Sequence, residues 1–137
     1  MKILKILAAL VLLGVLLWAG GNKPAASLQQ TTWTLTKLNG KKVNAPRTQL
    51  ILHENLKAYG SGGVNRFTGI YRLGAANNDL VFGALASTKM LGLSPEVNQI
   101  ENDFFGALAQ TKRYKINGKT LILLDAGNKT LAELTAS

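Results

Sequence analysis

The chain has 137 residues and a formal net charge of +9, from 16 Lys and Arg against 7 Asp and Glu. It contains one histidine and no cysteine. This length fits one domain behind a removable leader, and the missing thiols exclude disulfides, thiolate metal ligands and a lipid attached to cysteine.

Residues 1–21 have the pattern of a signal peptide, in which Lys2 and Lys5 precede an apolar run over 6–18. The run is shorter than the about 20 apolar residues of a membrane-spanning helix. Small residues suitable for cleavage follow at Ala19–Gly21, and again at Ala25–Ser27. We therefore expect a periplasmic or secreted protein. An uncleaved segment that tethers the protein to a membrane is the alternative.

Residues 22–30 lack periodicity and predict a tether before a domain over 31–137. Within that domain, alternating apolar and polar residues predict short strands joined by turns. Asn39-Gly40 and Asn77-Asn78 are turn sequences, and Asn117-Gly118 fits a type I′ hairpin turn. The expected strands are 32–36, 49–54, 57–61, 66–73, 79–85, 114–116, 120–124 and 130–135.

One segment, over about 95–110, predicts a helix. Ser94 is a favourable N-cap, Pro95 suits the first helical position, and Glu96 suits the first turn. Apolar residues then recur at spacings of three and four, which predicts one buried stripe. The stripe consists of Val97, Ile100, Phe104 and Leu108, and solvation and the helix dipole account for the acids Glu101 and Asp103.

This order of elements predicts an α+β fold with a strongly curved, mostly antiparallel, half-barrel-like sheet of about seven or eight strands and one amphipathic helix. Glycines inside strands mark bulges, bends or close backbone approach. We expect the bends at Gly60, Gly62, Gly63 and Gly69. The sheet side of the core should comprise Trp33, Leu50, Leu52, Phe67, Tyr71, Phe82, Leu121 and Leu123.

The most specific motif is G-G-x-N-R-F-T-G-x-Y over 62–71, followed by T-K-M over 88–90. Together with W-x-L-x-x-L-N-G over 33–40 and F-G-x-L-A-x-T-x-M over 82–90, it resembles the META domain, the family of the heat-shock protein HslJ. The resemblance implies a small exported envelope protein, sometimes stress-inducible and associated with antibiotic tolerance, with no established catalysis. It also implies a likeness in shape to the half-barrel pilot proteins of secretins.

The motif residues are predicted to be structural, because Asn65 and Arg66 can satisfy backbone groups left free by a bulge. A ligand-binding corner is the alternative. Many members of the resembled family carry cysteines where Val64 and Gly92 stand here, and many are lipoproteins, so this chain departs from them in both respects. The motif set is Gly62, Gly63, Asn65, Arg66, Phe67, Gly69, Tyr71, Thr88, Lys89 and Met90.

Other kinds of site are disfavoured. His53 lacks the companions for a zinc site or a serine triad, and the acids do not form a glycosidase pair. The glycines at 60–63 precede a strand, whereas a phosphate-binding loop precedes a helix. We expect no catalytic residue, cofactor, metal or nucleic acid. We expect a monomer whose partner is an envelope protein or an anionic lipid or polymer. A carrier of an acyl chain or apolar peptide is the alternative.

Overall fold

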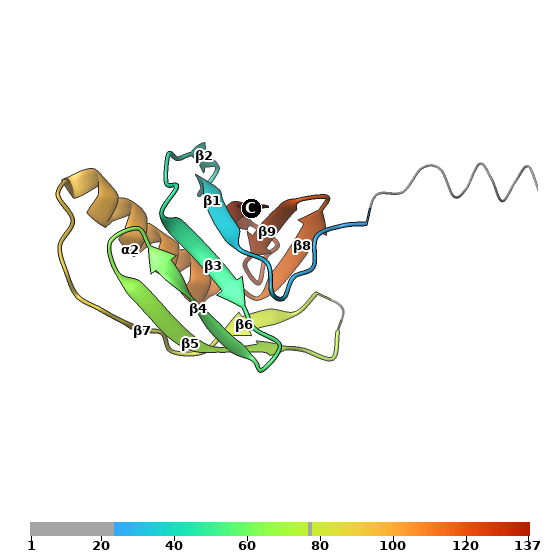
Figure 1. The fold of residues 1–137 in the computed structure, drawn as a ribbon. Helices are drawn as coiled ribbons and strands as arrows, with labels where there is room; N and C mark the ends of the chain where they lie inside the picture. The colour runs from blue at the N-terminus through green and yellow to red at the C-terminus, as the bar shows by residue number, and fades with distance from the viewer. Residues whose placement is uncertain (1–23, 77) are drawn as a thin grey trace, which may run out of the picture.

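The computed structural model describes residues 24–76 and 78–137, which form one α+β domain (Figure 1). Its helix and strands follow the predicted order, and the helix bounds agree with the sequence pattern. Two very short strands, β2 and β7, were not predicted because two residues carry no periodicity. The elements are β1 Trp33–Leu38, β2 Lys41–Lys42, β3 Thr48–Leu52, β4 Lys57–Gly62, β5 Arg66–Leu73, β6 Leu80–Phe82, β7 Ala86–Ser87, α2 Pro95–Gln110, β8 Arg113–Asn117, β9 Thr120–Leu124 and β10 Thr130–Ala136.

The strands form a single antiparallel sheet that is almost closed. Its order is β6-β5-β4-β3-β1-β10-β9-β8, with β2 added to β1 and β7 added to β5. The two ends of this order meet where the backbone N–H of Leu80 donates to Lys112 at 3.0 Å and that of Tyr114 donates to Asn78 at 3.0 Å. The predicted half-barrel is therefore confirmed, and the sheet curls further than half-way.

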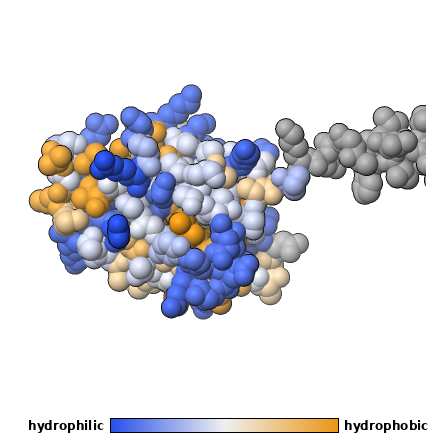
Figure 2. Space-filling model, viewed as in Figure 1, coloured by the Kyte–Doolittle hydropathy of each residue, from blue (hydrophilic) through white to orange (hydrophobic). Residues whose placement is uncertain are grey.

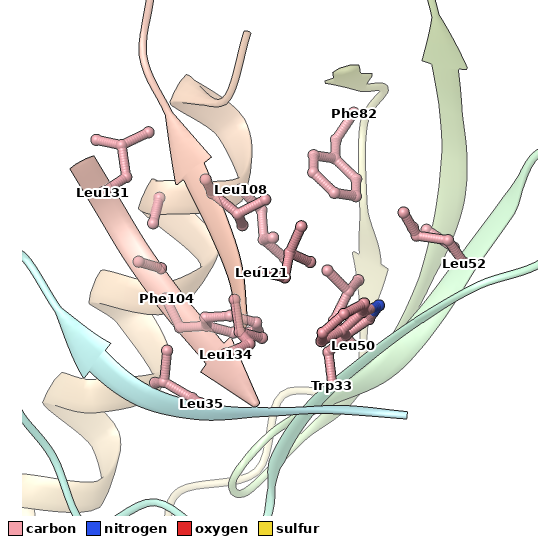
Figure 3. Close-up of a cluster of buried hydrophobic side chains, with 14 of the residues drawn as sticks. Trp33, Leu35, Leu50, Leu52, Phe82, Phe104, Leu108, Leu121, Leu131 and Leu134 are labelled. Carbon is pink, nitrogen blue, oxygen red and sulfur yellow. The ribbon is translucent and has the colours of Figure 1, made fainter. Parts of the chain in front are cut away.

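The core fills the inner side of this curved sheet, against the helix (Figure 3). All eight residues predicted for the sheet side of the core are buried. Phe104 and Leu108 of α2 are fully buried against them, but Val97 is 39 % exposed. The predicted helical stripe is thus wrong in its first turn, because α2 reaches the sheet only from its second turn onwards.

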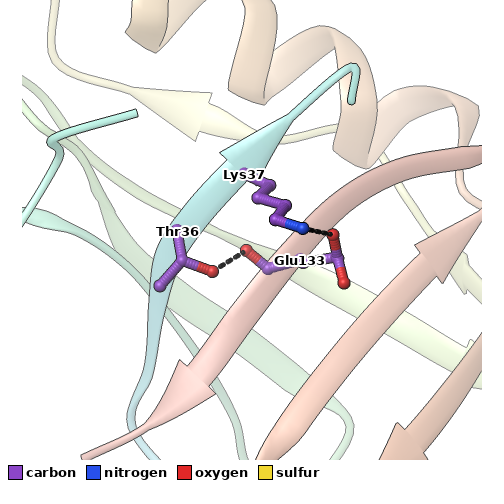
Figure 4. Close-up of polar contacts among 3 residues, drawn as sticks. All are labelled: Thr36, Lys37 and Glu133. Atoms are coloured by element: carbon purple, nitrogen blue, oxygen red, sulfur yellow. Dashed lines mark hydrogen bonds and ion pairs between the residues drawn. The ribbon is translucent and has the colours of Figure 1, made fainter. Parts of the chain in front are cut away.

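A bulge in β1 adds curvature at the centre of the sheet. The β1–β10 register shifts between Leu35 and Lys37, so Thr36 has no partner residue. Its hydroxyl donates to the backbone carbonyl of Glu133 at 3.1 Å, and Lys37 Nζ lies 3.5 Å from Glu133 Oε2 (Figure 4). A bulge increases local twist, which helps the sheet to curl.

Among the glycines at which the sequence predicts bends, Gly63 lies in the β4–β5 turn with a φ of 115°, whereas Gly60 and Gly62 allow close approach. The β3–β4 and β4–β5 registers are continuous through Gly60, so no bulge lies there. A Cβ at Gly60 would lie 2.0 Å from the carbonyl oxygen of Gln49, and one at Gly62 would lie 2.5 Å from Glu101 Cγ. These glycines permit close approach of neighbouring backbone and side chains.

Two local predictions need correction. Leu28 is buried, Trp33 Nε1 donates to its carbonyl at 3.1 Å, and Ala26 N–H donates to Gly118. The segment predicted as a tether is therefore docked on the domain from residue 26.

In the β8–β9 hairpin, Asn117 pairs with Thr120, and Gly118 takes the positive φ of 60°. The turn residues are Gly118 and Lys119, which is a type II′ arrangement.

The signal-peptide prediction for residues 1–21 lies outside the described residues. Within the part that the structure describes, no helix has the length and apolar character needed to cross a membrane.

Candidate functional site

Asn65 is the centre of a polar network at the turn between β4 and β5, in which Asn65 and Glu101 are buried and Thr88 is exposed. Its side-chain oxygen accepts from the Thr88 hydroxyl and from Met90 N–H, each at 2.8 Å. Its side-chain nitrogen donates to the Met90 carbonyl at 2.9 Å and to Glu101 Oε1 at 2.5 Å. A primary amide has two hydrogens to donate and two acceptor lone pairs. All four are used, so Asn65 has no capacity left for a ligand.

Glu101 completes this network from the helix. Its side chain is 5 % exposed, and Oε2 accepts from the backbone N–H groups of Val64 at 2.9 Å and Asn65 at 2.6 Å. With the bond from the Asn65 amide, one carboxylate receives three N–H donors. Burying a carboxylate is unfavourable unless it is hydrogen-bonded, so these donors account for its position. We call Asn65, Thr88 and Glu101 the Asn65–Glu101 network.

The network holds the loop before α2 by its backbone. Both the N–H and the carbonyl of Met90 bond to Asn65. Two residues on, Gly92 N–H donates to Asn98 Oδ1 at 2.7 Å, and Asn98 Nδ2 donates to the Gly92 carbonyl at 3.5 Å. The loop is thus fixed at two points, by side chains from the β4–β5 turn and from α2.

The side chains of this loop face outward. The exposed fraction is 62 % for Met90, 88 % for Leu91 and 107 % for Leu93. Beside them lies a groove of about 490 Å³ between the loop, the start of α2 and the segment 44–48. Its walls are largely apolar and include Val64, Met90, Leu91, Leu93, Val97 and Ile100. We call residues 89–93 the apolar loop.

The predicted motif residues divide between this corner and the core. Asn65, Thr88 and Met90 meet directly, whereas Phe67 and Tyr71 are buried core residues. The Tyr71 hydroxyl donates to the His53 carbonyl and accepts from Gln29. Arg66 and Lys89 are exposed, and Arg66 joins the corner through its carbonyl, which accepts from Thr88 N–H at 3.2 Å. Gly69 lies in mid-strand, where a Cβ would lie 2.6 Å from Leu85.

The sequence prediction missed Glu101. It assigned this residue to solvent, but Glu101 is buried and bonded to the motif 36 residues earlier in the chain. One signal was available: Glu101 lies three residues before Phe104 and seven before Leu108, on the buried face of the helix. An acid on an apolar helical face needs partners, and the strand-linking turn of the motif supplies them.

His53 lies away from this corner. Its ring stacks on Tyr59, with centroids 4.4 Å apart and an interplanar angle of 22°. Among residues 24–76 and 78–137, no group of three or more His, Asp or Glu side chains gathers as a metal site would require.

A family model of the META domain matches residues 26–137, which includes the docked segment, the network and the apolar loop. The chain belongs to the META domain family. The matched region begins at residue 26, and among the described residues Ala26 is also the first whose backbone bonds to the domain.

Solved structures share the fold of this META domain. An NMR structure of a protein from Burkholderia xenovorans is 24 % identical, with a TM-score of 0.63, and the match covers 86 % of this chain and 96 % of the other. A crystal structure of a DUF4847 family protein from Bacteroides vulgatus is 15 % identical, with a TM-score of 0.59. This match covers 79 % of this chain and 93 % of the other. These likenesses concern the fold alone. No curated protein matches the chain.

The META domain of this chain brings together the two positions at which many members of the resembled family carry cysteines. A Cβ on Gly92 would lie 2.7 Å from Val64 Cγ2. Cysteines at these two positions would therefore lie close enough to be linked. The corner between the β4–β5 turn and the apolar loop is instead held by hydrogen bonds.

Proposed function

We propose that this META domain is a non-enzymatic binding module of the bacterial cell envelope, exported and associated with stress or antibiotic tolerance. It acts by contact with a partner protein or an anionic envelope surface. The observation that carries the proposal is the pairing of a hydrogen-bonded polar network with an exposed apolar loop at the same corner.

The Asn65–Glu101 network is suited to holding a loop. Asn65 uses its full hydrogen-bonding capacity inside the domain, and Glu101 accepts three N–H donors. A general acid or base must reach the proton that it transfers. Glu101 is 5 % exposed and is oriented toward the β4–β5 turn, so its geometry favours a positioning role over proton transfer to a substrate.

The exposed side chains next to the network support a role in contact. Large apolar side chains that cluster on a surface mark interaction sites in soluble domains. The net charge of +9 favours anionic partners through long-range attraction. The basic start and apolar run over 1–18 support export, where the anions are lipid headgroups and envelope polymers.

Fractionation and cross-linking of the full chain in its own cells test this proposal. We expect to find the protein in the periplasmic or membrane fraction. We also expect it to be cross-linked to a partner, in an amount that increases under envelope stress. A protein found only in the cytoplasm would overturn the proposal. Turnover of a generic ester, peptide or glycoside substrate by the purified protein would overturn its non-enzymatic part.

A second candidate is a carrier, similar to a secretin pilot, that holds an acyl chain or an apolar peptide. The concave side of the sheet is filled by core side chains such as Trp33 and Phe104, each 0 % exposed. The groove beside the apolar loop, with a volume of about 490 Å³, is the feature that favours this candidate. Native mass spectrometry of gently purified protein should then show a bound lipid or peptide, and Ile100→Glu in the groove should remove it.

A further inference from the structure

We infer that the apolar loop inserts into the headgroup region of an anionic lipid bilayer, while neighbouring basic residues contact the lipid phosphates. This inference rests on the proposed envelope location and narrows the anionic surface to lipid. Three features of the loop support it: which side chains it exposes, how its backbone is bonded, and which charges surround it.

The first feature is a compact apolar tip. Met90, Leu91 and Leu93 are all more than half exposed, and Leu93 at 107 % projects fully into solvent. Figure 2 shows hydrophobic side chains gathered at the end of the molecule where the loop leads into α2, with hydrophilic side chains around them. Side chains that project from a surface can enter a bilayer, whereas a recessed patch cannot reach it.

The second feature is that the loop is bonded to the domain through the backbone of two of its residues, Met90 and Gly92. The N–H and carbonyl of Met90 bond to Asn65, and those of Gly92 bond to Asn98. A backbone group that enters an apolar phase without a partner is strongly unfavourable. Because these four groups are already paired, the backbone at Met90 and Gly92 can leave water without breaking hydrogen bonds, and an insertion limited to the headgroup region keeps the rest of the loop backbone near water and phosphate. The same bonds fix the loop in advance, which lowers the entropy lost on binding.

The third feature is the charge around the tip. Lys89 begins the loop, Arg47 lines the groove beside it, and Arg66 bonds to Thr88 through its carbonyl. All three side chains are exposed, and neither ion pair among the described residues includes them. Glu96 is the exposed acid nearest in sequence, and Glu101 is buried in the network. An apolar tip with surrounding bases matches the chemistry of an anionic membrane surface.

Tryptophan reporters in the full chain test the inference. Trp18→Phe removes one of the two native tryptophans, and the buried Trp33 remains as a common background. Leu91→Trp then reports on the loop. Leu73→Trp is the control, because Leu73 is also partly exposed, at 44 %, but lies at the far end of β5 from Arg66. Each variant is mixed with phosphatidylglycerol–phosphatidylethanolamine or phosphatidylcholine vesicles that carry brominated acyl chains.

We expect brominated acyl chains in the anionic vesicles to quench Leu91→Trp roughly threefold more than Leu73→Trp. The difference should shrink in phosphatidylcholine, in high salt, and when Arg47→Glu and Lys89→Glu are added. If the apolar run at the N-terminus bound the vesicles, it would change the quenching of Leu91→Trp and Leu73→Trp alike. A difference between the two variants therefore reports on the loop itself. Quenching that is absent, equal at both positions, or unchanged in neutral vesicles would overturn the inference.

Cross-linking in cells separates this inference from the proposed function. If the exported protein cross-links to a protein partner, and Leu91→Ser with Leu93→Ser removes that cross-link, the loop binds protein. The lipid inference then fails while the proposed function stands. If the protein is not exported, the proposed function fails, whatever the vesicles show.

Discussion

The Asn65–Glu101 network and the apolar loop lie side by side, yet they reverse the usual placement of polar and apolar groups. The network buries a carboxylate and an amide, at 5 % and 4 % exposure, whereas the loop exposes three large apolar side chains. Each arrangement alone is unfavourable. Together they are consistent, because the buried polar groups hold the backbone of a loop whose side chains must stay outside.

The comparison gives different expectations for the two regions. Substitutions in the network should change the stability of the domain, because they leave buried polar groups without partners. Substitutions of the exposed apolar side chains of the loop, at Met90, Leu91 and Leu93, should leave stability unchanged and alter binding alone. The following variants test this division, beginning with the largest expected effects.

Asn65→Ala should lower the free energy of unfolding by about 3 kcal/mol, because it removes four hydrogen bonds and leaves Glu101 short of a donor. Urea unfolding measures the change. Asn44→Ala, at an exposed position beside the groove, is the matched control and should shift the free energy by less than about 0.5 kcal/mol. Equal effects of the two variants would show that the network does not hold the corner.

Joint Val64→Cys and Gly92→Cys substitution should create a disulfide that fixes the loop to the β4–β5 turn. The Cβ of residue 92 would lie 2.7 Å from the γ carbon of Val64, near the position that a cysteine sulfur would take. Closing this stretch of chain should raise the free energy of unfolding by about 3 kcal/mol. In reducing buffer the double variant should instead have a lower free energy of unfolding than the unsubstituted protein. The reason is that the new Cβ at residue 92 would also lie 2.6 Å from Val97. Two free thiols per chain after oxidation would contradict the geometry.

Gly62→Ala should lower the free energy of unfolding by about 2 kcal/mol, because its Cβ would press on α2 at Glu101 and Phe105. Gly106→Ala is the matched control on α2 itself. A Cβ at Gly106 meets no atom within 4 Å, so the better helix propensity of alanine should raise the free energy by about 0.5–1 kcal/mol. Thermal and urea unfolding measure the free energy of both variants, which we expect to fall for Gly62→Ala and to rise for Gly106→Ala. A neutral Gly62→Ala would mean that α2 is not held closely against β4.

Joint Leu91→Ser and Leu93→Ser substitution should change the free energy of unfolding by less than about 0.5 kcal/mol, because neither side chain packs on the domain. The same pair should reduce binding of the full chain to its partner or surface. Leu73→Ser, also partly exposed, is the control for a general loss of surface hydrophobicity. A loss of stability above about 1 kcal/mol would place the loop in the core and remove the contrast with the network.

The sequence by itself determined the order of elements, the bounds of the helix and the inner face of the sheet. Strands 66–73 and 120–124 and helix 95–110 agree with the structure residue by residue, and all eight predicted core residues are buried. These features repeat with period 2 or 3.6 over neighbouring residues, and capping and turn residues act locally. The motif also picked out Asn65, Thr88 and Met90, which the structure brings into direct contact.

The tertiary structure alone decided the burial of Glu101, the outward direction of the apolar loop, the docking of residues 26–30 and the close approach at Gly60. Glu101 could be read as a solvated helix residue until a turn 36 residues earlier supplied its three donors. The type II′ turn at Gly118 likewise follows from the register of the hairpin. Contacts between distant segments depend on how the elements pack. A local pattern of residue types does not determine which donor will bond to which acceptor in a distant segment.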